Sequence, residues 1–369
     1  MIRIMIKSSI LALSLLLSGC GGDNAFDGSG LIGGGAEVKS DVFTSLQKEV
    51  LTLNANELLT SLAQLKSQIK AFDANVTSND VSAMQRNFIT IMQEWKSVES
   101  VFVAGDYNRD LARSARLFDF YRTGKRLNVA SDVASALKKN SPIDQALYLN
   151  SSKSITALEY LLFGANETED NLVMAMNIDS NRRVDALNVT IDNLMNISKE
   201  IHDFYKNDAK FVANSLDASN ALVNALVDSA FRLKEHRIGD SAGISVKFKG
   251  NPDPSRFEYE KSRLSLEAMI AILTTHQDIM GKRSYDNFGS FASKNGASEI
   301  VTQIQKKIQS ALTQLNAFSN PIEESITKIS VDTKVQTLYD TIKTLQELYF
   351  ASLIQALDLT AEIIEADGD

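Results

Sequence analysis

The sequence contains little cysteine, histidine or proline: of its 369 residues, one is Cys, three are His and four are Pro. A single Cys excludes a disulfide framework and any metal centre built from several thiolates. Three His exclude a histidine-rich metal cluster but leave room for a mixed site. So few prolines favour long uninterrupted helices over a β-protein with many turns. The formal net charge of −8 argues against a nucleic-acid binder, which would need a basic face.

The N-terminus has the pattern of an export signal. Arg3 and Lys7 precede a short apolar run over residues 8–17, which is too short to span a membrane as a mature helix. The run ends in Leu17-Ser18-Gly19-Cys20, which resembles a bacterial lipobox, cleaved before the Cys. We therefore predict a signal peptide over residues 1–19 and a lipidated Cys20. An ordinary secretory signal with an accidental Cys is the alternative.

The residues after the predicted cleavage site suggest where the protein resides. Gly21 follows Cys20, in place of the Asp that is associated with retention in the inner membrane. We therefore expect a lipid anchor in the outer membrane, with the body facing the periplasm, and several acyl chains would hold it firmly. The remainder of residues 20–40 is rich in Gly and is predicted to be a flexible linker.

From residue 41 onward the pattern is helical. Leu58, Leu62, Leu65 and Ile69 recur at the spacing of one apolar helix face, and similar faces run through residues 300–318 and 335–353. Alternation with a period of two is almost absent. The pattern predicts an all-α fold of long antiparallel helices in two helical bundles. We place these bundles at residues 41–206 and 207–369.

Motifs of nucleophilic or histidine-based catalysis are missing. His202, His236 and His276 do not form an HExxH pair, and we interpret them as surface or helix-capping residues. Nucleophile-elbow, phosphate-loop and dinucleotide fingerprints are also absent.

The segment 154–164 is the most informative stretch for chemistry. If it is a helix, Thr156 and Glu159 share one face, and Glu159 lies among apolar neighbours. A carboxylate in such surroundings needs a partner, a cation or a proton. A Glu on the polar edge of an amphipathic helix is the simpler alternative.

This segment resembles the signature of the imelysin-like family, GxHxxE followed by an apolar run and Phe-Gly. Four further stretches match family motifs in the same order along the chain. They are Trp95–Phe102 ahead of Gly105, Asp119-Phe120-Tyr121, Glu258–Leu266, and Ala356–Asp369 with its closing Asp-Gly-Asp. The resemblance therefore runs from about residue 45 to the end of the chain.

The resemblance implies two helical bundles, a periplasmic location and a link to iron uptake. Glu159 matches the motif Glu, whereas Ser154 and Thr156 replace the motif Gly and His. Glu99 and Asp119 match acidic positions that some members bring beside the motif. With Glu159 they would form an all-oxygen site for a hard cation, because Thr is a poor ligand for transition metals. No motif requires a cofactor, and a metal cation, iron or another divalent ion, is the one candidate.

The favoured function is a non-enzymatic periplasmic lipoprotein with a binding or accessory role in iron or metal uptake. Two alternatives remain open. One is a metallopeptidase of the imelysin type, which the replacement of the motif His by Thr156 disfavours. The other is a tethered helical module that binds another envelope protein. Apart from the membrane anchor, we expect a metal ligand or such a protein as the partner, and no nucleic acid.

Overall fold

The structure is a computed structural model that describes residues 41–72, 75–121, 128–164, 167–178 and 182–362. Cys20, the linker and the closing Asp-Gly-Asp lie outside the described residues. The described part is helical and contains no strand beyond one antiparallel bridge between Ile326 and Val331. The predicted all-α fold is confirmed. None of the described helices is long and apolar enough to cross a membrane.

The longer helices follow one another along the chain with short helical turns between them. In chain order they are α2 (Leu53–Lys70), α3 (Ser78–Ser100), α5 (Arg109–Phe118), α6 (Val129–Leu137), α8 (Ile155–Phe163), α9 (Glu169–Asn177), α10 (Arg182–Asn207), α12 (Ser215–Arg232), α14 (Ser265–Met280), α16 (Ser298–Asn316) and α17 (Thr333–Glu347). The short α-helices are α1 (Asp41–Leu46), α4 (Ala104–Tyr107), α7 (Ile143–Ala146), α11 (Lys210–Ala213), α13 (Asp240–Ala242), α15 (Phe288–Ala292) and α18 (Ile354–Ala356).

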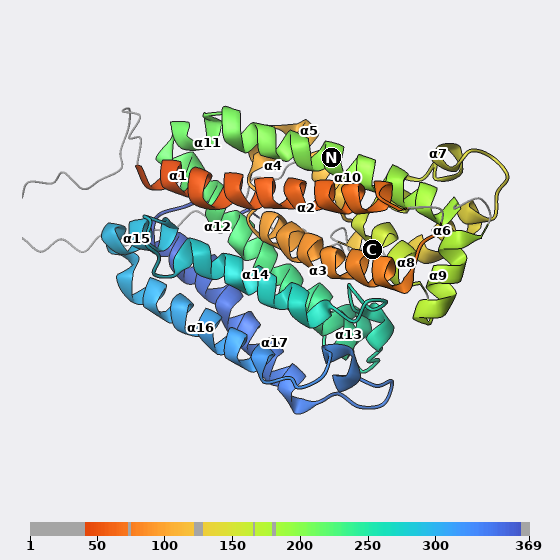
Figure 1. The fold of residues 1–369 in the computed structure, drawn as a ribbon. Helices are drawn as coiled ribbons and strands as arrows, with labels where there is room; N and C mark the ends of the chain where they lie inside the picture. The colour runs from red at the N-terminus through yellow and green to blue at the C-terminus, as the bar shows by residue number, and fades with distance from the viewer. Residues whose placement is uncertain (1–40, 73–74, 122–127, 165–166, 179–181, 363–369) are drawn as a thin grey trace, which may run out of the picture. The chain divides into compact units, whose positions relative to one another are not determined.

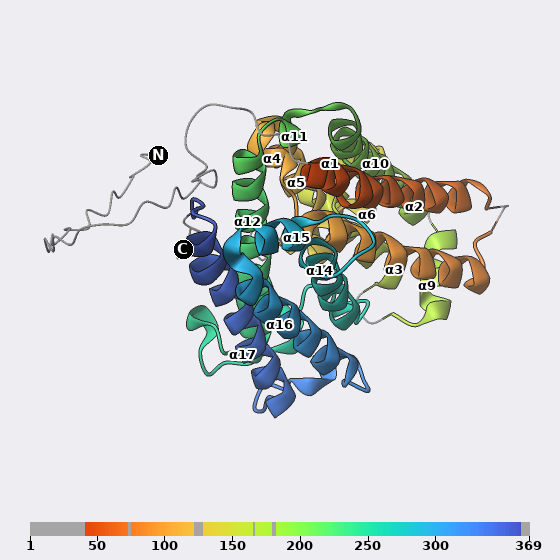
Figure 2. The ribbon, with the colours of Figure 1, turned by 90° about the vertical axis from the view of Figure 1, so that its left-hand side faces the viewer.

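Two groups of helices pack against each other. Helices α2, α3, α8 and α10 form one group, and α12, α14, α16 and α17 form the other (Figure 1). The contact between α3 and α14 joins the two groups. Figure 2 shows these two helices side by side in a view turned by 90°. The contacts place the described residues in one compact unit. The predicted boundary coincides with the end of α10, and a division into two bundle domains stays a prediction.

The buried faces of the helices are the ones that the sequence periodicity indicates. In α2, Leu58, Leu62, Leu65 and Ile69 are all buried. In the C-terminal helix, the buried positions recur from Val335 to Leu353 at the same spacing. Removal of these apolar stripes from water stabilises the packing by roughly 25 cal/mol for each Å² buried. The helices therefore form because their stripes cover one another.

Several helices contain a turn of π-helix, in which one extra residue is accommodated. The turn that matters for the site is η5 (Leu233–Gly239), which continues α12 and leads directly into α13. Such turns are uncommon and occur often at functional sites. This turn displaces the residues after Leu233 from the register that α12 alone would set.

One helix start predicted from the sequence is wrong. The segment Ser255-Arg256-Phe257-Glu258 has the pattern of a capping box, with Ser255 as the cap. In the structure Asp253 caps a short 3₁₀ turn, η7 (Pro254–Arg256), which ends before Glu258. The carboxylate of Glu258 that would close the box instead accepts hydrogen bonds from Lys96 and Arg237.

Candidate functional site

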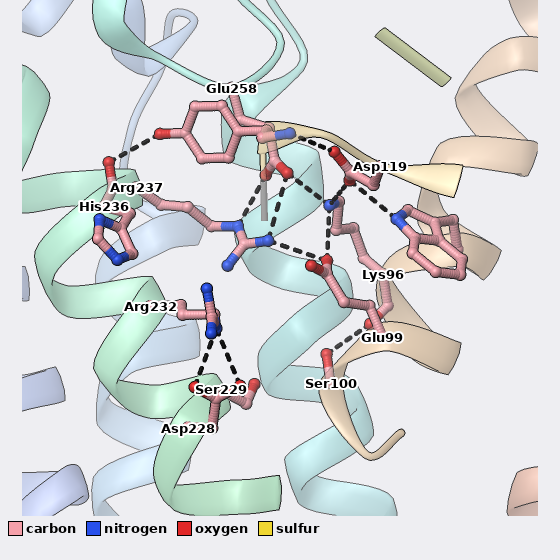
Figure 3. A network of polar contacts seen from close by, with 12 residues as sticks. Lys96, Glu99, Ser100, Asp119, Asp228, Ser229, Arg232, His236, Arg237 and Glu258 are labelled. Carbon is pink, nitrogen blue, oxygen red and sulfur yellow. Dashed lines mark hydrogen bonds and ion pairs between the residues drawn. The ribbon is translucent and has the colours of Figure 1, made fainter. Parts of the chain in front are cut away.

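A buried cluster of five charged side chains lies where α3 meets the second group of helices (Figure 3). Lys96 and Glu99 project from α3, and Asp119 directly follows α5. Arg237 comes from η5 and Glu258 from the segment after η7. We call these five residues the ion-pair cluster. Its members are separated by up to 162 positions in the sequence, so the fold alone brings them together.

The ammonium of Lys96 lies at the centre of three carboxylates. Its Nζ is 2.7 Å from Glu99 Oε2, 2.8 Å from Asp119 Oδ2 and 2.5 Å from Glu258 Oε1. An ammonium has three N–H donors, so each carboxylate receives one of them. The side chain of Lys96 is completely shielded from solvent. The ring of Tyr259 lies beside it, with Nζ 5.4 Å from the ring centroid.

The guanidinium of Arg237 closes the cluster on the opposite side. Its Nε donates to Glu258 Oε2 at 2.7 Å, and its Nη2 donates to Glu258 Oε1 at 3.2 Å. The same Nη2 donates to Glu99 Oε2 at 2.9 Å. Both oxygens of Glu258 are therefore engaged by cations, in the two-pronged geometry that makes Arg–carboxylate pairs strong.

Neutral donors fix the position of Asp119. The indole Nε1 of Trp95 donates to Asp119 Oδ2 at 2.9 Å, and the backbone N–H of Tyr121 donates to Oδ1 at 2.9 Å. Trp95 stacks on Phe118 with ring centroids 4.0 Å apart. The chain leaves α5 at Asp119 in an extended conformation, which turns this carboxylate toward α3.

The charges of the cluster nearly balance. Three carboxylates and two cations give a formal charge of −1. Burial disfavours the charged form of Lys96, but Asp119, Glu258 and Glu99 outweigh it and raise the pKa of Lys96. Despite burial, Glu258 and Glu99 likewise raise the pKa of Arg237. Burial raises the pKa of Glu258, against the pull of Arg237 and Lys96. Both cations thus stay charged inside the protein.

A cavity of about 460 Å³ adjoins the cluster and contains Glu159 in its wall. Thr156, Glu159 and Tyr160 line it from α8, and Glu258 belongs to both the cavity wall and the cluster. Its acidic lining residues, Glu159, Asp253, Glu258 and Glu260, outnumber the basic ones, Arg256 and Lys261. Because Glu258 and Glu260 are paired with cations of the protein itself, the protonation of Glu159 decides whether the wall carries a net negative charge.

Glu159 is buried, and no cation among the described residues forms an ion pair with its carboxyl group. Its Oε1 accepts hydrogen bonds from Ser262 N at 2.8 Å and from Ser262 Oγ at 2.7 Å. Burial raises the pKa of Glu159 to about 8, although the two hydrogen bonds from Ser262 oppose the shift. The side chain thus carries a proton at neutral pH. Glu159 thus has a hydrogen-bond partner and a raised pKa, two of the ways in which a carboxyl group among apolar neighbours is accommodated.

Helix α8 places Glu159 by means of its two ends. Ser154, which stands where the family motif has Gly, caps the helix by accepting a hydrogen bond from Ala157 N. The helix stops at Gly164, whose φ of 68° and ψ of −160° suit glycine. A Cβ at Gly164 would lie 2.6 Å from Glu167 Cδ, so a larger residue does not fit there.

The structure brings two of the three predicted metal ligands together. Glu99 and Asp119 share the ion-pair cluster with Glu258, while Glu159 lies in the cavity wall and bonds to Ser262. Thr156 lines the same cavity. Lys96, Arg237 and Glu258 are site residues that the sequence did not predict. The family stretch 258–266 was the one signal that pointed to Glu258.

One histidine prediction is wrong as well. His276 is fully buried rather than exposed or capping, and its ring nitrogens lie 2.9 Å from Ser229 Oγ and 3.2 Å from Tyr349 OH. Burial lowers the pKa of His276 to about 3, so it is neutral and links α12, α14 and η10 (Leu348–Leu353) inside the core. The sequence periodicity places it on a helix but does not reveal these partners.

The cluster has the carboxylates of a metal site, but a protein cation already occupies the position between them. Glu99, Asp119 and Glu258 each offer an oxygen within 4.8 Å of the other two, a donor set that suits a hard cation. The position that such a cation needs is held by Lys96 Nζ, which bonds to all three carboxylates. As arranged, these residues do not fit a metal ion.

The fold and the site define a class: helical proteins with a buried charge cluster and an acid-lined cavity between packed helices. The chain belongs to the imelysin family, because the family model Peptidase_M75: Imelysin matches residues 52–349. The resemblance predicted from the sequence is thereby confirmed. No curated protein is significantly similar to the chain.

Two solved structures share the fold. An imelysin-like protein from Psychrobacter arcticum 273-4 has a TM-score of 0.69 and 15% identity, over 87% of this chain and 96% of that one. A protein from Parabacteroides distasonis ATCC 8503, described as a candidate iron-regulated protein A precursor, has a TM-score of 0.65 and 13% identity. That match covers 88% of this chain and 97% of the other. At such identities the likeness concerns the fold alone.

Proposed function

We propose that the protein is a non-enzymatic binding protein of the cell envelope, with its ligand site in the Glu159 cavity and a role in iron or metal uptake. The observation that carries the proposal is the buried carboxyl group of Glu159 at the wall of a cavity of about 460 Å³. Unlike Glu99 and Glu258, Glu159 forms no ion pair with the described residues, and its carboxyl group accepts hydrogen bonds from the N–H and hydroxyl of Ser262. It is thus available to a ligand.

A cation is the ligand class that suits this cavity. Its acidic lining residues outnumber the basic ones, and the pKa of about 8 means that Glu159 exchanges a proton near neutral pH, so the wall gains a negative charge when this proton leaves. A cation that binds there would displace this proton, as metals do when they bind to protonated ligands. The link to iron is supported by the family and by the description of the Parabacteroides protein as iron-regulated. The metal hypothesis therefore rests on Glu159 rather than on Glu99 and Asp119.

A binding role is favoured over the metallopeptidase alternative by the donor set. Zinc peptidases hold their metal with His and carboxylate ligands and activate a water molecule. Thr156 occupies the position of the family His, and none of the described lining residues is His or Cys. Chelator-sensitive cleavage of a peptide substrate would revive the peptidase hypothesis.

The envelope location is part of the same proposal. A lipid on Cys20 would hold the protein in the outer membrane, with the body in the periplasm and residues 20–40 as the spacer. Metabolic labelling with a fatty acid, followed by membrane fractionation, tests it. We expect the label and the membrane association to be lost in Cys20→Ser. Labelling that persists in this variant would contradict the anchor.

Calorimetric titration of the full-length chain in detergent tests the ligand site. We expect Mn²⁺, and Fe²⁺ under anaerobic conditions, to bind with release of a proton, measured from titrations in buffers of different ionisation enthalpy. Glu159→Gln should abolish this binding. Glu323→Gln is a matched control, because Glu323 is also buried, accepts a hydrogen bond from Ser265 N and has a raised pKa through burial.

Two outcomes would contradict the metal hypothesis: the wild-type chain binds neither ion, or Glu159→Gln binds as tightly as the wild type. Co-purification of a protein from envelope extracts, unchanged by Glu159→Gln, would instead support the role of a tethered docking module.

A further inference from the structure

The ion-pair cluster carries an inference that goes beyond the proposed function of the cavity. We propose that the Lys96 ammonium is the resident cation of the Glu99, Asp119 and Glu258 carboxylates, and that it closes this cluster to metal ions. A divalent cation takes the position only when the ammonium is removed. The juxtaposition of a donor set for a metal and a lysine at its centre is the basis of this proposal (Figure 3).

The dimensions of the carboxylate set match a cation in the place of Nζ. The three ligand oxygens lie within 4.8 Å of one another. Oxygens on opposite sides of Ca²⁺ are separated by about twice its usual Ca–O distance of 2.3–2.6 Å. The observed spread therefore fits a calcium-sized ion. Lys96 Nζ already lies 2.5 to 2.8 Å from one oxygen of each carboxylate, so a metal ion and the ammonium cannot occupy the position together.

The charge balance gives the same result. The cluster has a formal charge of −1 with Lys96 and Arg237 present, so a divalent ion added to it would leave an excess of positive charge in a buried site. Buried charges are costly unless they are paired. Without the lysine charge the cluster would carry −2, which a divalent cation neutralises. Lys96 thus decides whether the carboxylates accept a metal.

The cluster also differs from the Glu159 cavity in how many of its carboxylate oxygens are already bonded to cations of the protein. Glu258 belongs to the wall of the cavity, but both of its oxygens are engaged by Lys96 and Arg237. A ligand in the cavity therefore meets Glu159 without needing the cluster. A negative result for metal binding at the cluster therefore does not contradict the proposed ligand site at Glu159, and the reverse also holds.

Metal titration of the full-length chain in detergent tests the proposal, with Ca²⁺ and Mn²⁺ as probes. In Lys96→Met we expect a new site that binds Mn²⁺ at least about tenfold more tightly than any site in the wild type. A second substitution, Asp119→Asn, should weaken this new site by about 10–100-fold, in line with the usual sensitivity of metal sites. Lys66→Met is the control, because Asp192 is the one carboxylate that pairs with Lys66 among the described residues, so its loss creates no carboxylate set.

A second measurement does not require Lys96→Met to fold. The unfolding temperature should change equally with millimolar Mn²⁺ in the wild type and in Asp119→Asn. A metal-dependent stabilisation of the wild type that disappears in Asp119→Asn would overturn the proposal. A folded Lys96→Met that gains no Mn²⁺ site would overturn it as well.

A more conservative variant covers the case in which Lys96→Met does not fold. Lys96→Gln removes the positive charge, leaves the cluster at −2, keeps all three carboxylates as ligands and retains N–H donors in place of the ammonium. We expect it to fold and to gain a weaker Mn²⁺ site. If this folded variant also lacks such a site, the carboxylates do not form a latent metal site and the proposal is wrong.

Discussion

The ion-pair cluster and the Glu159 cavity hold buried carboxyl groups in two different ways. In the cluster, Glu99, Asp119 and Glu258 face the cations of Lys96 and Arg237. In the cavity, Glu159 accepts hydrogen bonds from the hydroxyl and backbone N–H of Ser262, and burial raises its pKa to about 8. The same residue type is thus held by ion pairs in one place and by a proton in the other. The neighbours, not the burial, set this difference.

Removal of Arg237 should produce the largest effect of those that we predict. Arg237→Met leaves Glu258 and Glu99 buried without this partner, and a broken buried ion pair costs about 3–5 kcal/mol. Urea unfolding measures the loss. Arg232→Met is the matched control at the end of the same helix, because Arg232 pairs with Asp228 near the surface and should cost about 0–1 kcal/mol. Similar losses in both variants would show that the cluster contributes no special stability.

The proton on Glu159 predicts a pH dependence of the free energy of unfolding. A carboxyl group with a raised pKa in the folded state contributes stability below its unfolded pKa of about 4.5 and loses it as the pH rises through about 8. Glu159→Gln mimics the protonated acid and removes this dependence. Between pH 5 and 8, we expect the free energy of unfolding of the variant to rise relative to that of the wild type by on the order of a few kcal/mol.

Urea unfolding across this pH range checks the prediction, with Glu260→Gln as the control on the same cavity wall. Glu260 pairs with Lys261 and is partly exposed, so its substitution should leave most of the pH dependence of the free energy of unfolding in place. An unchanged slope in Glu159→Gln would mean that Glu159 is ionised in the folded protein.

Loss of a neutral hydrogen-bond donor to Asp119 in the cluster should lower the free energy of unfolding more than loss of a neutral donor to Glu159. Trp95→Phe keeps an aromatic ring against Phe118 but removes the indole N–H that donates to Asp119. Hydrogen bonds to charged groups contribute about 1.5–3 kcal/mol, so we expect a loss of this size in urea unfolding. A loss below that of Ser262→Ala would reverse the contrast between the two regions.

Ser262→Ala should produce the smallest effect. It removes the hydroxyl that donates to Glu159 Oε1 but leaves the backbone N–H in place. A neutral hydrogen bond contributes about 0.5–1.5 kcal/mol. Because this bond favours the ionised form of Glu159, its loss should raise the pKa of Glu159 further, and the destabilisation should grow as the pH rises. A destabilisation that is independent of pH would contradict the assignment of the proton.

The fold followed from the sequence more fully than the site did. The apolar spacing from Val335 to Leu353 predicts a buried helix face, and the residues on it are buried. Such patterns are local, so one sequence suffices to detect them. The family resemblance identified Glu99 and Asp119, and the structure places them together.

The cations of the cluster could not be predicted in this way. A lone lysine on an amphipathic helix normally faces solvent, and Lys96 is buried because Glu258 reaches it from 162 positions away. Arg237 follows the start of a π turn, where the usual helical period no longer indicates which residues face inward. Glu258 matched a helix-capping pattern, and only the tertiary contacts show its other role.

The π turn of η5 makes the length of this helix as important as its composition. A π turn contains one residue more than an α turn needs, so deletion of Lys234 would allow a regular α-helix to form. Each residue of an α-helix turns the chain by about 100°. Deletion of this extra residue would keep Arg237 close to its present direction, because the residues after a π turn keep the phase of an α-helix that is one residue shorter. A regular α-helix of unchanged length would instead turn Arg237 by about 100° away from Glu99 and Glu258. The extra residue of η5 therefore directs the guanidinium toward its carboxylates.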